Sequence, residues 1–312
     1  MPELRHDPVM DKLVLVAPER AARPMTVRAP ETRAEAPRDC PFCPGNEADT
    51  PPETGRIGPG APGTPGWRAR AFPNLYPIVG GPGTRAGATG AHEVIALSPD
   101  HNASFAQLEL DQATDALALL RDRSSYHASR HSYTHVFVNQ GRDAGASIEH
   151  PHAQLVALDF VPPAVEALTG RFAGDNDPLA VDLEQARAAD LAISDTEVSA
   201  AWCPFAGIAP YEVRVAVRGA PPRFELTNNV ALRSFALALR DVLSRTVAAI
   251  GDVPYNVVVH SFPQNVSDDL HWFATVRPRT TIVAGFELGT GVLVNPVAPE
   301  HAARHLREAA AA

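Results

Sequence analysis

Apolar and polar residues follow the same order of strand and helix patterns twice along the chain. Alternating or continuous apolar runs predict the strands, which lie at residues 92–97, 135–139, 152–158, 211–217, 255–260 and 271–276. Residues 105–129 and 229–250 show the spacing of helices, and Asn228 and Gly251 fit the cap and the stop of the second helix. In each half the predicted helix follows one strand and precedes two others, so the pattern indicates an internal repeat.

Two sets of mainly antiparallel strands, each with a crossing helix, are typical of an α+β fold. We therefore expect two tandem halves, each a mainly antiparallel sheet with packed helices, at residues 1–170 and 185–312. Gly174 and Asp177 lie among other loop-forming residues and predict a linker near residues 165–190.

The composition narrows the class of protein. The 312 residues are 45% hydrophobic and 20% charged, which is enough apolar material for a large core. The net charge of −9 argues against a nucleic-acid partner, because phosphate backbones are bound mainly through Lys and Arg. No apolar run approaches the roughly 18 to 20 residues that cross a bilayer, and the N-terminus lacks the layout of a signal peptide. We therefore expect a cytoplasmic protein without a membrane or nucleic-acid partner.

The run His150-Pro151-His152-Ala153-Gln154 carries candidate chemistry. On an extended strand His150, His152 and Gln154 project from one face, because side chains alternate. A neutral imidazole is nucleophilic near pH 7 and can attack an activated phosphate, while an amide donor stabilises charge that grows on the phosphoryl oxygens. The alternative is a polar, solvated edge strand, since short motifs also occur by chance.

Cys40 and Cys43 form a C-x-x-C motif whose two thiolates can share one tetrahedral metal ion. A redox-active pair uses the same spacing but normally opens a helix, whereas these cysteines lie among prolines and Gly45. Zinc is therefore the favoured interpretation, and the segments around His101 and His150 could supply the other two ligands. Two reduced cysteines without a metal are the alternative.

Five segments of the chain share one family pattern of order and spacing. They are residues 17–24 (Ala-Pro-Glu-Arg-Ala-Ala-Arg-Pro), 40–43 (Cys-Pro-Phe-Cys), 72–74 (Phe-Pro-Asn), 98–101 (Ser-Pro-Asp-His) and 139–154, which begins with Asn-Gln-Gly and ends with His-Pro-His-Ala-Gln. In these segments the chain resembles the galactose-1-phosphate uridylyltransferase family. That family is a branch of the histidine-triad superfamily and moves nucleoside monophosphates through a covalent nucleotidyl-histidine. A weaker similarity continues to the C-terminus.

The resemblance implies a role for each matching residue. One zinc ion would be bound by Cys40, Cys43, His101 and His150, while His152 would be the nucleophile and Gln154 would hold the transferred phosphoryl group. Arg20, Arg23 and Ser147 match positions near the substrate phosphates, Phe72 and Asn74 positions near the base and ribose, and Asn139 and Gly145 positions around the nucleotide. The guanidinium groups of arginines and the backbone N–H groups of glycine-rich loops both bind phosphate oxygens well. The two arginines could instead be solvated, and Asn139 could simply end a strand.

The C-terminal half departs from the family pattern. His260 matches one position of a second metal site found in some members, but Thr275 and Arg277 occupy later ligand positions, so we expect no second metal. Glu287 matches a carboxylate that binds sugar hydroxyls, and Phe286 replaces a tyrosine.

The segment that follows is more similar to a sister group, the ADP-glucose phosphorylase-like branch. It consists of Gly289-Thr290-Gly291 together with Asn295-Pro296. A Gly/Thr loop with free N–H groups could bind a small anion such as inorganic phosphate, or it could be a plain turn between strands.

We therefore expect a nucleotidylyltransferase that moves a nucleoside monophosphate from a nucleotide sugar to a sugar 1-phosphate through nucleotidyl-His152, with ping-pong kinetics. The alternative is a nucleotide-sugar phosphorylase that uses inorganic phosphate as the acceptor. A third hypothesis is a zinc-stabilised nucleotide-binding module in which His152 is never modified. With four protein ligands, the zinc ion would be structural. The resemblance also implies a homodimer and two histidine-triad-like halves, of which the second has lost the catalytic motif.

Overall fold

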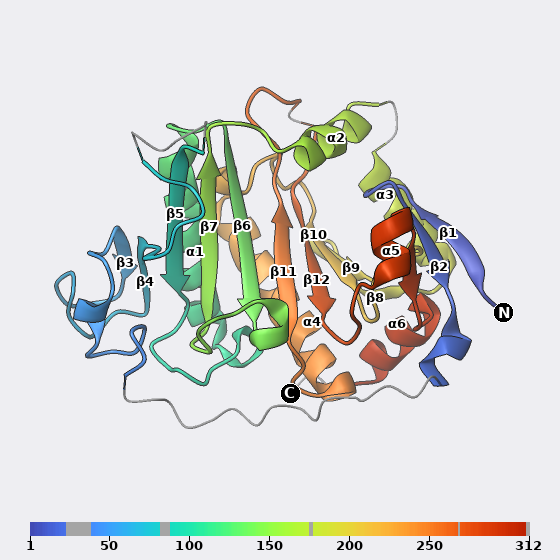
Figure 1. Cartoon of the computed structure of the whole chain (residues 1–312), viewed down its shortest axis with the longest axis horizontal. Helices are drawn as coiled ribbons and strands as arrows, with labels where there is room; N and C mark the ends of the chain where they lie inside the picture. The colour runs from blue at the N-terminus through green and yellow to red at the C-terminus, as the bar shows by residue number, and fades with distance from the viewer. Residues whose placement is uncertain (23–38, 82–87, 175–176, 268, 310–312) are drawn as a thin grey trace.

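The computed structural model describes residues 1–22, 39–81, 88–174, 177–267 and 269–309 (Figure 1). Within these residues one large antiparallel sheet has the strand order β3-β4-β5-β7-β6-β11-β12-β10-β9-β8. Its strands are β3 (Gly55–Ile57), β4 (Ala69–Pro73), β5 (Gly90–Ala96), β6 (Tyr133–Gln140), β7 (His152–Leu158), β8 (Ala192–Asp195), β9 (Ser199–Trp202), β10 (Val213–Val217), β11 (Tyr255–His260) and β12 (Phe273–Pro278). A smaller sheet contains β1 (Glu3–Asp7), β2 (Lys12–Val16) and β13 (Leu293–Asn295).

The two halves of the chain build the large sheet in the same way. From the centre outward, the first half adds β6, β7, β5, β4 and β3, and the second half adds β11, β12, β10, β9 and β8. The halves meet where β6 pairs with β11, with Val138 opposite Val257. The predicted α+β class is therefore confirmed. Each half contributes five antiparallel strands, and β6 and β11 join the two sets into one sheet by satisfying each other's unpaired edges.

The helices are α1 (Leu110–Ala128), α2 (Pro163–Phe172), α3 (Pro178–Ala188), α4 (Asn229–Ile250), α5 (Gly285–Thr290) and α6 (Pro299–Glu308). Short 3-10 helices occur as η1 (Pro18–Ala22), η2 (Glu47–Asp49), η3 (Phe105–Gln107), η4 (Arg142–Ala144) and η5 (Phe224–Leu226). The prediction for α4 is confirmed to the residue, because the Asn228 side chain accepts a hydrogen bond from Ala231 N and Gly251 ends the helix at φ 82°. No helix of the described residues is long and apolar enough to span a bilayer.

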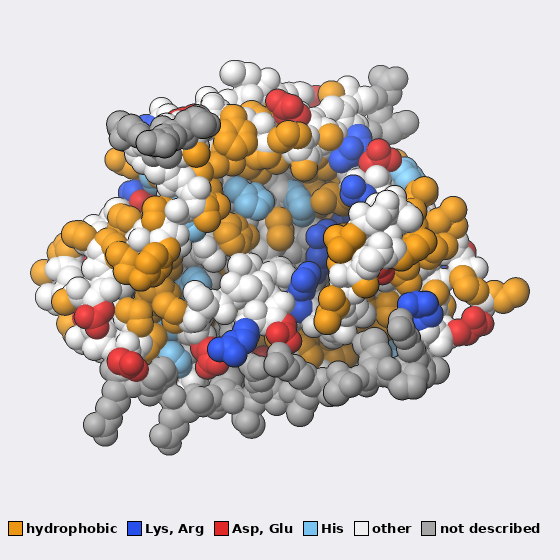
Figure 2. Space-filling model, in the orientation of Figure 1, with side chains coloured by type: hydrophobic (Ala, Val, Ile, Leu, Met, Phe, Trp, Pro, Cys, Tyr) orange, Lys and Arg blue, Asp and Glu red, His pale blue; other side chains and the backbone are white. Residues whose placement is uncertain are grey.

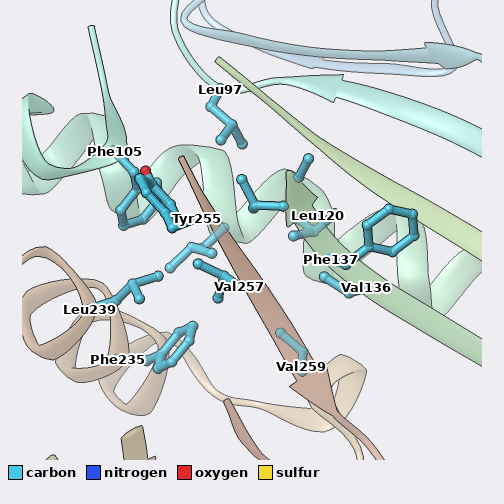
Figure 3. A pocket seen from close by; sticks show the side chains of 13 residues that line it. Leu97, Phe105, Leu120, Val136, Phe137, Phe235, Leu239, Tyr255, Val257 and Val259 are labelled. Carbon is cyan, nitrogen blue, oxygen red and sulfur yellow. The ribbon is translucent and has the colours of Figure 1, made fainter. Parts of the chain in front are cut away.

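The long helices α1 and α4 lie behind the large sheet and cover one of its faces (Figure 1). Their apolar side chains, such as Leu120 and Phe235, pack against Val136 and Val257 of the central strands. A cavity of about 20 Å³ remains among these groups, and its lining is apolar (Figure 3). Its volume is close to that of a single water molecule, so this cavity is a packing defect of the core and not a substrate site.

The opposite face of the sheet is free of α1 and α4. Along β7, Ala153 and Leu155 enter the main core, so the alternating His152 and Gln154 project from the opposite face. Figure 2 shows a hollow over the middle of this face, with histidine side chains on its floor and Lys or Arg side chains on its right. The sheet therefore separates an apolar, helix-covered side from a polar concave side.

The predicted linker near residues 165–190 is mostly helical, which corrects that prediction. Helices α2 and α3 occupy most of it, and Asp177 caps α3 by accepting a hydrogen bond from Leu179 N at 2.9 Å. Pro178 stands at the first position of α3, where a proline starts a helix and does not break one.

A buried ion triad fixes α3 and the N-terminal hairpin to the sheet. Arg214 of β10 donates at 2.5 Å to Asp7 and at 2.6 Å to Asp182 of α3, and its side chain is fully buried. Trp202 Nε1 donates to the same Asp182 carboxylate at 2.6 Å. The segment between the two halves is thus part of the packed structure.

Candidate active site and metal centre

Four side chains from three segments meet beside the start of β7. The ligand atoms of Cys40, Cys43, His101 and His150 all lie within 4.8 Å of one another. Cys43 Sγ is 3.4 Å from His101 Nδ1 and 3.6 Å from His150 Nδ1, and Cys40 Sγ is 3.9 Å from His150 Nδ1. In a tetrahedral site with Zn–S of about 2.3 Å and Zn–N of about 2.0 Å, a sulfur and a nitrogen ligand are separated by about 3.5 Å. The cluster could therefore hold one metal ion, and its donors and spacing fit a structural zinc ion.

The orientation of His150 also suits a metal ligand. Its Nε2–H donates to Ser98 O at 2.7 Å, which leaves the unprotonated Nδ1 directed at the thiols. Without a cation, burial and the neighbouring Cys40 raise the pKa of Cys43 to about 11. A divalent cation would reverse this effect, because it stabilises the thiolates.

Buried polar and aromatic groups hold the cysteine loop against β4. Glu47 accepts from Trp67 Nε1 and from Gly45 N, each at 2.9 Å. Arg70 of β4 is fully buried and donates to Pro41 O at 3.0 Å. These contacts position the C-x-x-C motif before any ion binds.

Hydrogen bonding and burial determine the protonation of the His152 ring. Its Nδ1–H donates to His150 O at 2.8 Å, so Nε2 is the nitrogen that carries the reactive lone pair. The side chain is only 6% exposed, and burial lowers its pKa, which keeps the imidazole neutral near pH 7. The ring of Phe42 packs edge-on against it at 5.4 Å between centroids. Phe42 belongs to the C-x-x-C loop, so this loop supports the position of the His152 ring.

Gln154 lies on the same face, two residues beyond His152. Its Oε1 is 2.9 Å from His92 Nε2 of β5, and Asn74 Nδ2 approaches the same nitrogen at 3.2 Å. The structure therefore brings Asn74 and Gln154 together through a histidine that the sequence analysis did not select.

The loop between β6 and β7 is anchored to the second half of the chain. Asn256 of β11 donates to Asn139 Oδ1 and to Ala144 O, each at 2.8 Å. Gly145 has φ 94°, and a Cβ there would lie 3.5 Å from Asn139 Nδ2, so these two predicted residues are neighbours. Ser147 is exposed on the same loop, three residues before His150.

Other predicted substrate residues do not join this group within one chain. Arg20 is exposed in η1, which follows the hairpin β1–β2, and that hairpin lies at the opposite end of the molecule from β3 and β4 (Figure 1). Phe286 and Glu287 belong to α5, on the same side as the hairpin (Figure 1). Arg23 lies outside the described residues.

Phe72 and α5 have surroundings that the sequence patterns did not indicate. Phe72 is 2% exposed, with its ring 5.2 Å from Phe42, so it supports the cysteine loop more than it opens to a ligand.

The segment expected to be a Gly/Thr loop or turn is mostly part of the short helix α5, which corrects that prediction. At the start of this helix Glu287 accepts a hydrogen bond at 3.1 Å from the N–H of the N-cap residue Ala284, and Gly291 ends the short helix in the left-handed conformation.

His260, the residue of the second half that matches a metal-ligand position, contacts neighbouring side chains. His260 Nε2 is 2.9 Å from Thr275 Oγ1, and its ring stacks on Phe273 at 4.5 Å. Arg277 Nε donates to Glu212 at 3.0 Å. Burial lowers the pKa of His260 well below its ordinary value, so it is neutral near pH 7.

Sequence reasoning missed Phe42, His92 and Asn256. His92 lies on the same face of β5 as Val94 and Ala96, which pair with Gln154 and His152 of β7. This alternation along the strand was the sequence signal that could have placed His92 on the face of the candidate site. Phe42 and Asn256 gain their roles through contacts between distant segments, for which a single sequence carries no pattern.

Comparison with known proteins defines the class. A family model described as a domain of unknown function, DUF4921, matches residues 95–310. The chain is 32% identical to ADP-glucose phosphorylase of Arabidopsis thaliana, with 98% of this chain and 93% of that protein covered. It is 27% identical to galactose-1-phosphate uridylyltransferase of Thermotoga maritima, with 99% and 98% covered.

Solved structures of related proteins have the same fold as this chain. The crystal structure of an ADP-glucose phosphorylase from Arabidopsis thaliana with bound ADP-glucose superimposes with a TM-score of 0.85 at 29% identity, and all of both chains is covered. A uridylyltransferase structure with a TM-score of 0.68 and 24% identity, covering 98% of this chain and 97% of that one, has the same fold. The chain belongs to the family of galactose-1-phosphate uridylyltransferases and ADP-glucose phosphorylases. These relatives are nucleotidyltransferases and phosphorylases, which supports an enzyme of this superfamily.

Proposed function

We propose that the protein is a nucleotide-sugar phosphorylase that acts through a covalent nucleotidyl-His152 intermediate. The observation that carries the proposal is the buried imidazole of His152, whose Nδ1–H is held by His150 O while Nε2 is left to attack phosphorus. The 32% identity to an ADP-glucose phosphorylase supports inorganic phosphate as the acceptor and a nucleotide sugar such as ADP-glucose as the donor. The sequence motifs alone favour sugar 1-phosphate as the acceptor, whereas the higher identity to the phosphorylase favours inorganic phosphate.

The reaction would consist of two displacements. His152 Nε2 attacks the α-phosphorus, an N–P bond forms, and the P–O bond to the β-phosphoryl group breaks, so that sugar 1-phosphate leaves with the electron pair. An oxygen of inorganic phosphate then attacks the same phosphorus, the N–P bond breaks, and a nucleoside diphosphate leaves. His152 returns to its neutral form, so the cycle is balanced.

The remaining site residues bind and orient the substrate. Gln154 stabilises the transferred phosphoryl group, and the loop that contains Gly145 and Ser147 approaches the phosphates. Asn74 and Asn139 bind the nucleotide. Cys40, Cys43, His101 and His150 would hold zinc, which supplies a rigid support for the strand that carries His152.

A second candidate function is transfer of the nucleotidyl group to a sugar 1-phosphate. The similarity to a galactose-1-phosphate uridylyltransferase over 99% of the chain favours this reaction. The first half-reaction is the same in both cases, so the two functions differ only in which acceptor removes the nucleotidyl group from His152.

We also propose that the active protein is a homodimer. β7 and β9 are five positions apart in the sheet, or roughly 24 Å at about 4.8 Å per strand, and α5 and η1 lie on the β9 side. One small substrate cannot reach across that span to both His152 and Glu287. A second copy related by a two-fold axis would bring its Arg20 and Glu287 to the site, so that residues 1–170 supply catalysis and residues 185–312 complete substrate binding.

The test is the intact mass of the zinc-loaded protein after brief incubation with ADP-glucose or UDP-glucose. We expect a mass gain of one nucleoside monophosphate that is lost in His152→Ala. Chasing the adduct with inorganic phosphate should release a nucleoside diphosphate, whereas faster release by galactose 1-phosphate would establish the second candidate. A protein that forms no adduct with any nucleotide sugar yet binds one reversibly would be a binding module, and the proposal would be wrong.

A further inference from the structure

We propose that His92 is a positioning residue that holds the Gln154 amide with its NH₂ group toward the phosphoryl group at His152. This inference rests on the proposed function, because it concerns how Gln154 meets the transferred group. It adds a residue that lies on another strand, β5, and does not itself touch the reacting atoms.

The protonation of His92 follows from a donor whose direction cannot change. The backbone N–H of Ile78 points at His92 Nδ1, with 3.3 Å between the nitrogens. Nδ1 must then accept, so the proton of the neutral ring is on Nε2. His92 is 7% exposed, and burial lowers its pKa, which favours the neutral ring.

The proton on Nε2 determines the orientation of Gln154. Nε2 lies 2.9 Å from Gln154 Oε1, which is the distance of a good N–H to carbonyl hydrogen bond. With its oxygen occupied by His92, Gln154 presents its NH₂ group to the rest of the site. If the amide were rotated by half a turn, two donors would face each other at 2.9 Å and the carbonyl oxygen would face the phosphoryl oxygens.

Asn74 does not alter this assignment. Its Oδ1 accepts from Tyr76 N at 2.9 Å, which turns its NH₂ group toward His92 Nε2 at 3.2 Å. Two donors cannot form a hydrogen bond, so in this tautomer the Asn74 NH₂ group stays available for a nucleotide oxygen. The opposite tautomer would accept from Asn74 but would direct Nδ1–H at the Ile78 N–H, and the peptide plane cannot rotate to avoid that clash.

The chemical consequence is a donor aimed at developing charge. His152 and Gln154 are two residues apart on one face of β7, about 6.8 Å along the strand, so the Gln154 side chain can reach a phosphoryl group bound to His152. A carboxamide fixed by His92 donates to the oxygens that gain charge as His152 attacks, without reorganising during the step. A freely rotating amide would present its repulsive oxygen part of the time.

The experiment is a double-mutant cycle on single-turnover formation of the His152 adduct with ADP-glucose. We expect His92→Ala to lower the maximal rate roughly 10- to 100-fold with less than about a threefold change in half-saturating donor concentration. This loss is smaller than the roughly 100- to 1,000-fold loss of a deleted oxyanion donor, because Gln154 itself remains. Gln154→Ala should lower it at least as much, and the double variant should be no slower than Gln154→Ala alone. His92→Gln, whose amide can donate to Gln154, should recover part of the rate. Gln154→Glu should be slower than Gln154→Ala, because a carboxylate would repel the phosphoryl oxygens.

A readout independent of activity completes the test. Nitrogen-15 NMR of the wild-type protein should show the His92 ring protonated at Nε2, and protonation at Nδ1 would overturn the inference. Rate losses that multiply in the double variant would also overturn it, since His92 would then act separately from Gln154. Absence of any adduct in the wild type would instead reject the proposed function, and the NMR result would still report on the His92 orientation.

Discussion

At the scale of single residues, hydrogen bonds decide which nitrogen of each imidazole is used. His150 donates from Nε2 to Ser98 O and directs Nδ1 at the cysteines, whereas His152 donates from Nδ1 to His150 O and keeps the lone pair on Nε2. The two histidines are two positions apart in the same run, yet their backbone partners leave the lone pair on different ring nitrogens. A carbonyl acceptor placed on the correct side of each ring is enough to do so.

The protonation of His152 predicts the pH dependence of adduct formation. Burial lowers the pKa of His152 below the ordinary value of about 6.5. The neutral nucleophile therefore persists into mild acid, so the single-turnover rate should be constant from pH 8 to about 6.5 and fall only below it. The unfolded chain binds this proton at a higher pH than the folded one, so the free energy of unfolding should also decrease as the pH falls through about 6.5.

Quenched-flow mass spectrometry from pH 5 to 8 would measure this profile. Circular dichroism at each pH would separate loss of the nucleophile from loss of the fold. An acid limb with its midpoint above pH 6.5 would contradict a buried, neutral His152.

At the scale of elements, the cluster of Cys40, Cys43, His101 and His150 brings together three segments of the chain. All four residues lie in loops outside the strands. Cys40 and Cys43 precede β3, His101 follows β5, and His150 precedes β7. The loop that contains the two cysteines also contributes Phe42, which packs against His152. If the cluster holds the proposed zinc ion, loss of that ion should affect the loop and the His152 ring together.

Metal removal is predicted to destabilise the protein and prevent adduct formation. Treatment with a strong chelator, or Cys43→Ala, should lower the free energy of unfolding by several kcal/mol, because structural zinc binding is coupled to folding. Cys203→Ala is the control, since Cys203 is a cysteine more deeply buried than Cys43 and lies outside the cluster, and it should cost about 1 kcal/mol and keep one zinc per chain. Zinc content by emission spectrometry and thermal unfolding would check both variants. Full stability and activity of the metal-free protein would refute a structural zinc.

At the scale of the whole molecule, one sheet carries both halves and spreads the candidate site along its length. Exposed apolar side chains gather around α5, among them Ile282 (90% exposed), Phe286 (49%) and Leu288 (77%). Such a patch beside a predicted substrate residue is expected where another copy of the chain packs. This arrangement supports the proposed homodimer.

Mixed dimers would test whether the site is shared between two chains. His152→Ala and Glu287→Ala should each be nearly inactive alone. After the two variants are mixed and allowed to exchange subunits, about a quarter of the wild-type activity should return, because half of the dimers are mixed and each mixed dimer has one intact site. Light scattering should give the mass of a dimer for each variant. A monomer by light scattering, or no recovery in the mixture, would reject the shared site.

The sequence indicated much of the fold where the signals are local. The strand β7 and the helix α4 have the predicted bounds, since alternation marks one and side-chain capping with a terminal glycine marks the other. The linker was misread because Gly170 and Pro178 suggested a loop, although Gly170 lies inside α2 and Pro178 begins α3. Tertiary packing overrides such weak local preferences, as Asp182 of α3 does by binding Arg214.

By itself, the sequence determined the repeat of strands and helices, the two cysteines and the histidine motif, because these depend on neighbouring residues and on a family pattern. Only the tertiary structure decided that one sheet joins the halves, that His92 faces Gln154, and that Asn256 anchors the loop after Asn139. It also placed α5, which contains Glu287, and β7, which begins with His152, at different ends of the large sheet (Figure 1). The physical reason is that strand order and register bring together side chains more than 60 positions apart, and no local periodicity records that pairing.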